Sequence, residues 1–194
     1  MFTGLVYKTG VLIGLETSTV PVITIRVSLP DSIKIGSSVA INGACLTVIS
    51  IKDDIYKFNL SKETLSLSNY SDLSKGSYIN IELPLKLNDF LDGHMVSGHI
   101  DGTVRVRNIK SNKDSTKISF TFQDKLWKKY IIYKGSVTLN GISLTVSEKN
   151  DSFFSVDIIP HTLSNTNLMY LKKGERVNIE LDMIAKYIYN ITKK

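Results

Sequence analysis

The chain has 194 residues, of which 42% are hydrophobic, enough for one large or two small cores and too many for a disordered protein. Its 24 Lys and Arg outnumber its 18 Asp and Glu, giving a net charge of +6, but the positive charges are scattered along the chain. A nucleic-acid-binding surface normally needs a clustered basic patch, so we expect no nucleic-acid partner and only a mild attraction for anionic ligands.

Cys45 is the only cysteine, so it can form neither an internal disulfide nor a thiolate metal cluster. Residues 1–8 lack the charged start and long apolar core of a signal peptide. No apolar run approaches the ~18 residues that a membrane-spanning helix needs. The sequence therefore predicts a cytoplasmic protein with no membrane association.

In chain order, the first half predicts short strands rich in β-branched and aromatic residues at 22–27, 38–51, 56–60 and 78–83. The pair Asn42-Gly43 predicts a hairpin turn or bulge, because both residues tolerate positive φ. Short helices are predicted at 63–69, 124–133 and 162–167. Several short strands at close spacing favour a small closed barrel or a sandwich.

The chain also contains a repeat, because residues 38–48 recur as residues 136–146 with seven of eleven positions identical at an offset of 98. The same offset relates Asn80 to Asn178 and, near the start, Gly4 to Gly102, while residues 15–33 align only with compensating gaps. A period of this length indicates duplicated domains rather than a solenoid, whose units run to roughly 50 residues. We expect an N-terminal domain at 1–96 and a C-terminal domain at 97–187.

The last segment, residues 181–192, predicts a helix instead of a strand. Its apolar residues fall at helical spacing: Leu181, Ile184, Ala185, Ile188 and Ile191. Such a stripe must be buried either against the protein's own barrel or in an oligomer, and the pattern is compatible with both.

Candidate chemistry is sparse. The histidines His94, His99 and His161 have no spacing typical of a zinc site, so we expect no metal, and an isolated histidine is often only a structural hydrogen-bonding group. The repeat pairs Cys45 with Ser143 and places a threonine two residues after each of them. These small polar groups share one strand face and either bind a small polar ligand or form part of the sheet surface, and Cys45 can also be read as a small buried hydrophobic residue.

Several segments together resemble the riboflavin synthase family: residues 1–6, 42–48, 62–65, 93–99, 133–135 and 140–146, in this order along nearly the whole chain. The resemblance implies an all-β fold of two tandem six-stranded Greek-key barrels and a C-terminal helix that assembles a homotrimer. It also implies the reaction, in which two molecules of 6,7-dimethyl-8-ribityllumazine exchange a four-carbon unit to give riboflavin and 5-amino-6-(ribitylamino)uracil. No cofactor is implied, and an association with lumazine synthase is a further implied partner.

The resemblance also implies two substrate sites. The N-terminal site would use Gly4, Leu5, Val6, Cys45, Leu46, Thr47, Asn59, Leu60, Ser61, Lys62, Glu63, Thr64, Gly98, His99 and Ile100. The C-terminal site would use Gly102, Thr103, Val104, Lys134, Ser143, Leu144, Thr145, Asp157, Ile158, Ile159, Pro160, His161 and Thr162. His99 would assist proton transfer at the 7-methyl group, and Cys45 and Ser143 would activate or stabilise a nucleophile added at C7.

The two modules differ where ligands would bind, since Lys62 and Glu63 in the first correspond to Pro160 and His161 in the second. Asn140 also lies where family members commonly carry aspartate. The alternative function is a non-catalytic lumazine- or flavin-binding antenna protein built on the same repeats, which needs only one good site. A third reading is the flavin-binding barrel of an oxidoreductase, but this sequence contains no nicotinamide-binding half.

Overall fold

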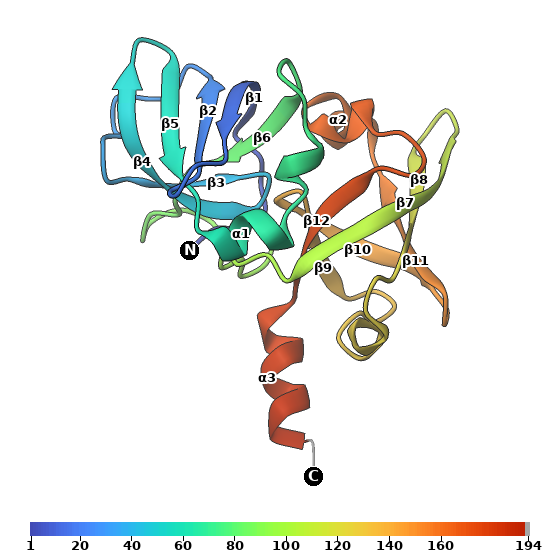
Figure 1. Ribbon diagram of the computed structural model, residues 1–194. Coiled ribbons are helices and arrows are strands. Elements are labelled where there is room, and N and C mark those ends of the chain that lie inside the picture. The colour runs from blue at the N-terminus through green and yellow to red at the C-terminus, as the bar shows by residue number, and fades with distance from the viewer. Residues whose placement is uncertain (193–194) are drawn as a thin grey trace.

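The computed structural model describes residues 1–192 and contains two closed antiparallel barrels of six strands each, placed side by side (Figure 1). Barrel one follows the strand order β1-β2-β5-β4-β3-β6. Its strands are β1 (Lys8–Glu16), β2 (Val22–Arg26), β3 (Ser38–Ile41), β4 (Ala44–Lys52), β5 (Ile55–Asn59) and β6 (Tyr78–Glu82). The predicted all-β fold of two tandem barrels is confirmed.

Barrel two repeats this topology, because β7 to β12 are arranged as β1 to β6 are. Its strands are β7 (Gly102–Ser111), β8 (Thr116–Thr121), β9 (Ser136–Leu139), β10 (Ile142–Lys149), β11 (Phe153–Ile158) and β12 (Arg176–Leu181). Each barrel closes around its own core. Phe58 and Ile79 are fully buried in the first core, and Phe120 and Phe154 are fully buried in the second.

Short helices connect or follow the strands: α1 (Lys62–Leu67), α2 (Pro160–Ser164), α3 (Met183–Thr192) and the 3-10 turns Tyr70–Asp72, Lys125–Lys129 and Asn167–Tyr170. Ser61 caps α1 by accepting a hydrogen bond from the Thr64 N–H at 2.9 Å. Pro160 occupies the first turn of α2, where its missing N–H costs nothing.

The turn predicted at Asn42-Gly43 is confirmed, because both residues have positive φ and divide the segment 38–51 into the hairpin strands β3 and β4. Two other elements differ from the sequence-based predictions. Strand β1 is not predicted by the sequence, because its residues, which include Gly10 and Gly14, lack strict apolar and polar alternation. The C-terminal helix begins at Met183, since Leu181 is the last residue of β12 and is buried in the core of barrel two.

The repeat has two offsets. An offset of 98 relates β3–β6 to β9–β12, but β1 corresponds to β7 at an offset of 94, as matching backbone bonds show: Tyr7 donates to Ile81 and Asp101 donates to Ile179. The second repeat therefore contains extra residues between its first and third strands, where the 3-10 turn Lys125–Lys129 lies. The equivalent of Gly4 is consequently Gly98, and the sequence-based pairing of Gly4 with Gly102 is wrong.

The two barrels meet through an asparagine cluster that the repeat supplies twice. The Asn178 amide donates to the Asn42 carbonyl, and the equivalent Asn80 amide donates to the Asn140 carbonyl, both at 2.9 Å. At the centre, Gly43 and Gly141 pack together so closely that a Cβ on either would lie 2.8 Å from the other's nitrogen. These buried hydrogen bonds fix the relative orientation of the barrels.

Candidate active site

Two equivalent segments cross between the barrels, and we call residues 1–6 the first arm and residues 95–100 the second arm. Phe2 and Val96 form an antiparallel bridge in which each N–H donates to the other's carbonyl, at 2.8 and 3.1 Å. Both side chains are buried, together with Ala40. The arms therefore form a short two-stranded ribbon shared by the two barrels.

Each arm ends on one site strand. The Cys45 N–H in β4 donates to the carbonyl of Gly98 in the second arm at 2.8 Å, and the Ser143 N–H in β10 donates to the carbonyl of Gly4 in the first arm at 2.8 Å. Ile100 packs against the core of barrel one, and Val6 packs against the core of barrel two. The first arm thus completes barrel two, and the second arm completes barrel one.

Glycine is required at both contact points. Gly4 and Gly98 have φ of 80° and 82°, in the left-handed region that other residues rarely adopt. A Cβ at Gly4 would lie 2.6 Å from the Ser143 Cβ, and a Cβ at Gly98 would lie 2.6 Å from the Cys45 Cβ. Each arm backbone consequently lies directly against Cys45 or Ser143, the two residues expected to activate or stabilise a nucleophile added at C7.

The site on barrel one is a cavity of ≈ 380 Å³ beside Cys45, a size suited to a small heterocyclic ligand. Strand β4 alternates so that Leu46 and Val48 point into the core while Cys45 and Thr47 lie on the outer face. Helix α1 and the second arm supply the rest of the wall. The cavity is lined by Cys45, Glu63, Thr64, Leu67, Gly98, His99 and Ile100.

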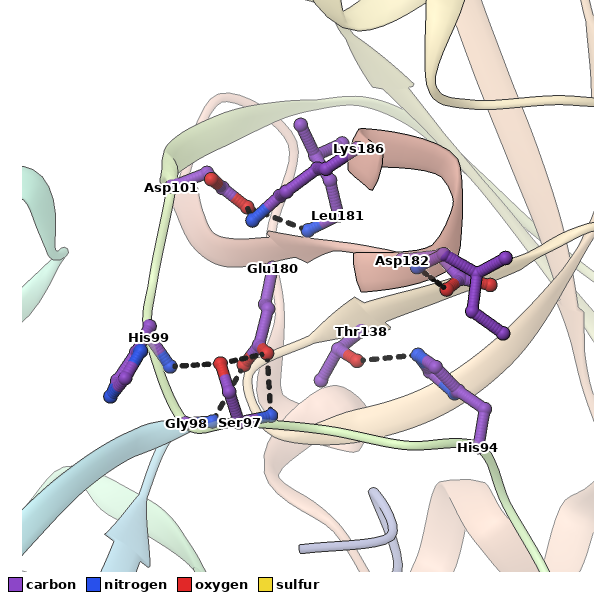
Figure 2. A network of polar contacts seen from close by, with 11 residues as sticks. His94, Ser97, Gly98, His99, Asp101, Thr138, Glu180, Leu181, Asp182 and Lys186 are labelled. Carbon is purple, nitrogen blue, oxygen red and sulfur yellow. Dashed lines mark hydrogen bonds and ion pairs between the residues drawn. The ribbon is translucent and has the colours of Figure 1, made fainter. Parts of the chain in front are cut away.

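The site on barrel two has the same scaffold and different chemistry. The His94 Nδ1 lies 2.7 Å from the Ser143 Oγ. Its Nε2 lies 3.2 Å from the Thr138 Oγ1, a contact drawn in Figure 2. The backbone holds His94 in this place, because the backbone N–H of His94 donates a hydrogen bond to the Thr3 carbonyl at 3.1 Å. A Cβ on the preceding Gly93 would lie 2.0 Å from that carbonyl, so only glycine permits this approach.

The electrostatics of this site favour a neutral imidazole. Burial lowers the pKa of His94 below its usual 6.5, and the nearby charges of Asp182 and Glu180 offset part of that shift. A neutral histidine can accept a proton from the Ser143 hydroxyl, which is the arrangement that activates a serine as a nucleophile. The sequence assigns His94 no specific role, since an isolated histidine is often only a structural hydrogen-bonding group, and its contacts with Ser143 and Thr138 reveal its place.

The remaining expected site residues take equivalent places on the two barrels, and of them Glu63 and Thr64 line the cavity of barrel one. Asn59 lies opposite Thr47 across the β4–β5 pair. Glu63 and Thr64 lie on α1, and their equivalents His161 and Thr162 lie on α2. Ser61, Lys62, Ile159, Pro160, Asp157 and Thr145 follow the same repeat relation and are exposed, whereas Leu144 is half-buried.

Other expected site residues lie elsewhere. The side chains of four apolar residues are buried inside the barrels, so only their backbone could face a ligand: Leu46, Leu60, Val104 and Ile158. Gly4, Leu5 and Val6 belong with Ser143 and not with Cys45. Gly102 and Thr103 pair with β12 beside Trp127, and Lys134 donates its N–H to Val146 at 2.9 Å.

Within residues 1–192, no group of three His, Cys, Asp or Glu side chains is arranged to hold a metal ion. Over the same residues, no helix is long and apolar enough to cross a membrane.

Comparison with known proteins gives a consistent result. The family described as the lumazine binding domain matches residues 3–84 and again residues 97–182. The riboflavin synthase of Escherichia coli (strain K12) is 41% identical over 185 residues, covering 94% of this chain and 87% of that protein. The riboflavin synthase of Bacillus subtilis (strain 168) is 34% identical over 196 residues, covering 100% of this chain and 91% of its own length.

Solved structures share the fold. LumP complexed with riboflavin superposes with a TM-score of 0.85 at 24% identity and covers 94% of this chain. LumP complexed with 6,7-dimethyl-8-(1'-D-ribityl) lumazine gives a TM-score of 0.83 at 24% identity. The chain therefore belongs to the riboflavin synthase family and carries the lumazine-binding domain twice.

Proposed function

We propose that this chain is a riboflavin synthase, which converts two molecules of 6,7-dimethyl-8-ribityllumazine into riboflavin and 5-amino-6-(ribitylamino)uracil. The observation that carries the proposal is the pair of equivalent sites with unequal chemistry: Cys45, His99 and Glu63 on barrel one, and Ser143 with His94 on barrel two. One molecule donates a four-carbon unit and the other accepts it, so the two substrates need different handling on similar scaffolds.

The reaction needs no external oxidant or reductant, because the unit lost by the donor is the unit gained by the acceptor. What the protein must supply is orientation, since holding two reactants together can contribute about 7–11 kcal/mol towards the barrier. The paired barrels supply two binding surfaces for the same heterocycle. Backbone groups of the arms and site strands would recognise the pyrimidinedione ring.

We assign proton transfer at the reacting methyl group to His99, which lines the cavity beside Cys45 with an exposed side chain. Cys45 on barrel one and Ser143 on barrel two, the latter in contact with His94, would activate or stabilise a nucleophile added at C7 of the lumazine.

A homotrimer is part of the same proposal. In it, barrel one of one subunit faces barrel two of a neighbour, and each such pair forms an active site. Helix α3 supports an assembly, because it projects away from both barrels and its apolar side chains are exposed: Ile184 by 58%, Ile188 by 57% and Ile191 by 80% (Figure 1). The Lys186 Nζ lies 2.6 Å from the Asp101 Oδ2 and anchors the helix to the barrel (Figure 2).

A cytoplasmic location also belongs to the proposal, since Cys45 is a free thiol at the site and stays reduced there. The association with lumazine synthase stays a prediction, which co-purification of the two proteins would test.

The enzyme and the antenna protein are separated by one experiment. Purified protein is incubated with 6,7-dimethyl-8-ribityllumazine alone, and the riboflavin and uracil products are quantified. We expect equal amounts of both products, with two lumazines consumed for each riboflavin. Tight lumazine binding without turnover would instead identify a binding protein.

A further inference from the structure

Each arm is held by one barrel and forms the site of the other. In the first arm, Thr3 donates to the Glu82 carboxylate from its N–H at 2.6 Å and from its hydroxyl at 2.9 Å, and the Gly4 N–H donates to the same carboxylate at 3.1 Å. Glu82 lies in β6 of barrel one. Gly4 nevertheless contacts Ser143 of barrel two.

The second arm repeats this arrangement in the opposite direction. Ser97 donates to the Glu180 carboxylate from its N–H at 2.7 Å and from its hydroxyl at 2.6 Å, and the Gly98 N–H donates to it at 3.0 Å (Figure 2). Glu180 lies in β12 of barrel two, whereas Gly98 contacts Cys45 of barrel one. The two carboxylates are equivalents in the repeat.

Both carboxylates are buried, with Glu82 exposed by 5% and Glu180 by 4%. A buried carboxylate is costly unless several donors satisfy it, and here every donor named comes from an arm. Burial raises the pKa of Glu82, while the hydrogen bonds from Thr3 and Gly4 lower it. Within the part of the chain described, no basic side chain forms an ion pair with either carboxylate within 4.0 Å.

We infer that Glu82 and Glu180 are positioning residues that act on the substrate site of the opposite barrel, Glu82 through Gly4 on the Ser143 site and Glu180 through Gly98 on the Cys45 site. This inference rests on the proposed function. Each carboxylate fixes the arm carbonyl that the site strand binds, so the backbone surface presented to the ligand depends on the other barrel. The two substrate sites of one chain are thereby structurally linked.

The inference predicts a crossed effect. Glu82→Gln keeps the size of the side chain and removes its charge, so it weakens the hold on the first arm. Riboflavin affinity at the barrel-two site should fall about tenfold, while affinity at the barrel-one site stays within about twofold of the original. Glu180→Gln should produce the reverse pattern. A purely structural role would instead weaken the site on the barrel that carries the mutated residue.

The two sites can be titrated separately by methyl NMR on the full-length protein, with riboflavin as the probe. The Ile100 methyl signals report on barrel one, and the Val6 methyl signals report on barrel two. Glu16→Gln, an exposed carboxyl at the end of β1, is the matched control and should change neither affinity. Should the Gln variants misfold, Thr3→Val and Ser97→Ala each remove the hydroxyl's bond to the carboxylate, together with the bond that the hydroxyl accepts from the Leu5 or His99 N–H, and should give the same crossed pattern at about threefold.

The outcomes separate this inference from the proposed function. If the unmodified protein binds riboflavin at neither site, the proposed function fails and takes the inference with it. If both sites bind and Glu82→Gln weakens barrel one, or weakens both sites equally, the inference is overturned while the proposed function stands.

Discussion

The two barrels share their strand order and the glycine that each arm presses against the site strand, yet their sites present different side chains. Barrel one has a thiol at Cys45 with an exposed histidine, His99, on the arm beside it. Barrel two has a hydroxyl at Ser143 in direct contact with the half-buried His94. The backbone scaffold that would recognise a ligand is thus duplicated. The histidines able to move protons, His99 and His94, differ in position between the two barrels.

The interface between the barrels likewise has equivalent positions that carry different side chains. Asp72 and Arg176 form a two-point ion pair across it, with Nε–Oδ2 at 2.5 Å and Nη2–Oδ1 at 2.7 Å. The equivalent positions are Tyr170 and Tyr78, whose rings stack with centroids 4.2 Å apart. One side of the interface is therefore held by an ion pair and the equivalent side by stacked tyrosine rings, whereas the asparagine hydrogen bonds are the same on both sides.

The largest expected effect comes from the arm glycines. Gly98→Ala places a Cβ against Cys45, and Gly4→Ala places one against Ser143, in backbone conformations that alanine adopts at a cost of about 1–2 kcal/mol. Displacing an arm by about 1 Å should lower kcat/KM about a hundredfold in either variant. Steady-state kinetics measures this loss. Gly36→Ala, at a positive φ with open space around its Cβ, controls for backbone strain alone and should retain most activity.

The histidines test whether the two sites have separate chemical roles. We expect His99→Ala and His94→Ala each to lower kcat about tenfold, because each removes one candidate for proton transfer. Both variants should remain folded, as checked by circular dichroism. Unchanged turnover in either variant would remove that histidine from the chemistry. Full activity of His161→Ala would show that His161, the α2 equivalent of Glu63, has no role in proton transfer.

The pH dependence should distinguish barrel two. Since burial lowers the pKa of His94, the folded protein binds fewer protons there than the unfolded chain does. The stability that the neutral imidazole contributes is present above pH 6.5 and is lost as the pH falls through the folded pKa. An NMR titration of the His94 ring should show a midpoint below 6.5. A midpoint above 6.5 would contradict the burial of this ring.

The smallest effect is expected at the interface. Asp72→Asn removes a partly exposed ion pair with Arg176 and should lower the free energy of unfolding by about 0.5–1 kcal/mol. Arg176 lowers the pKa of Asp72, so this contribution is present above the unfolded value of 3.8 and is lost as the pH falls through the folded pKa. Urea unfolding at neutral and acidic pH measures it. An equal difference between variant and original at both pH values would rule out the ion pair as its source.

The sequence predicted the barrels well because the repeated segments, including the hairpin around Asn42 and the strand after it, carry strong strand and turn signals. It missed the crossing of the arms for a physical reason. Each arm is held by Glu82 or Glu180 on one barrel and binds Ser143 or Cys45 on the other, and all four of these residues lie far along the chain from the arms they contact. The extra residues in the second repeat also hid the equivalence of Gly4 and Gly98, and with it the place of His94 beside Ser143.

The central claim is that barrel one and barrel two are unequal halves of one active site formed between neighbouring subunits. Co-expression of Gly98→Ala, which damages the first half, with Gly4→Ala, which damages the second, tests it directly. Random mixing of the two variants in a ring should restore about a quarter of the original activity, because about one interface in four then pairs an intact barrel one with an intact barrel two. Activity no higher than that of the separate variants would contradict the account.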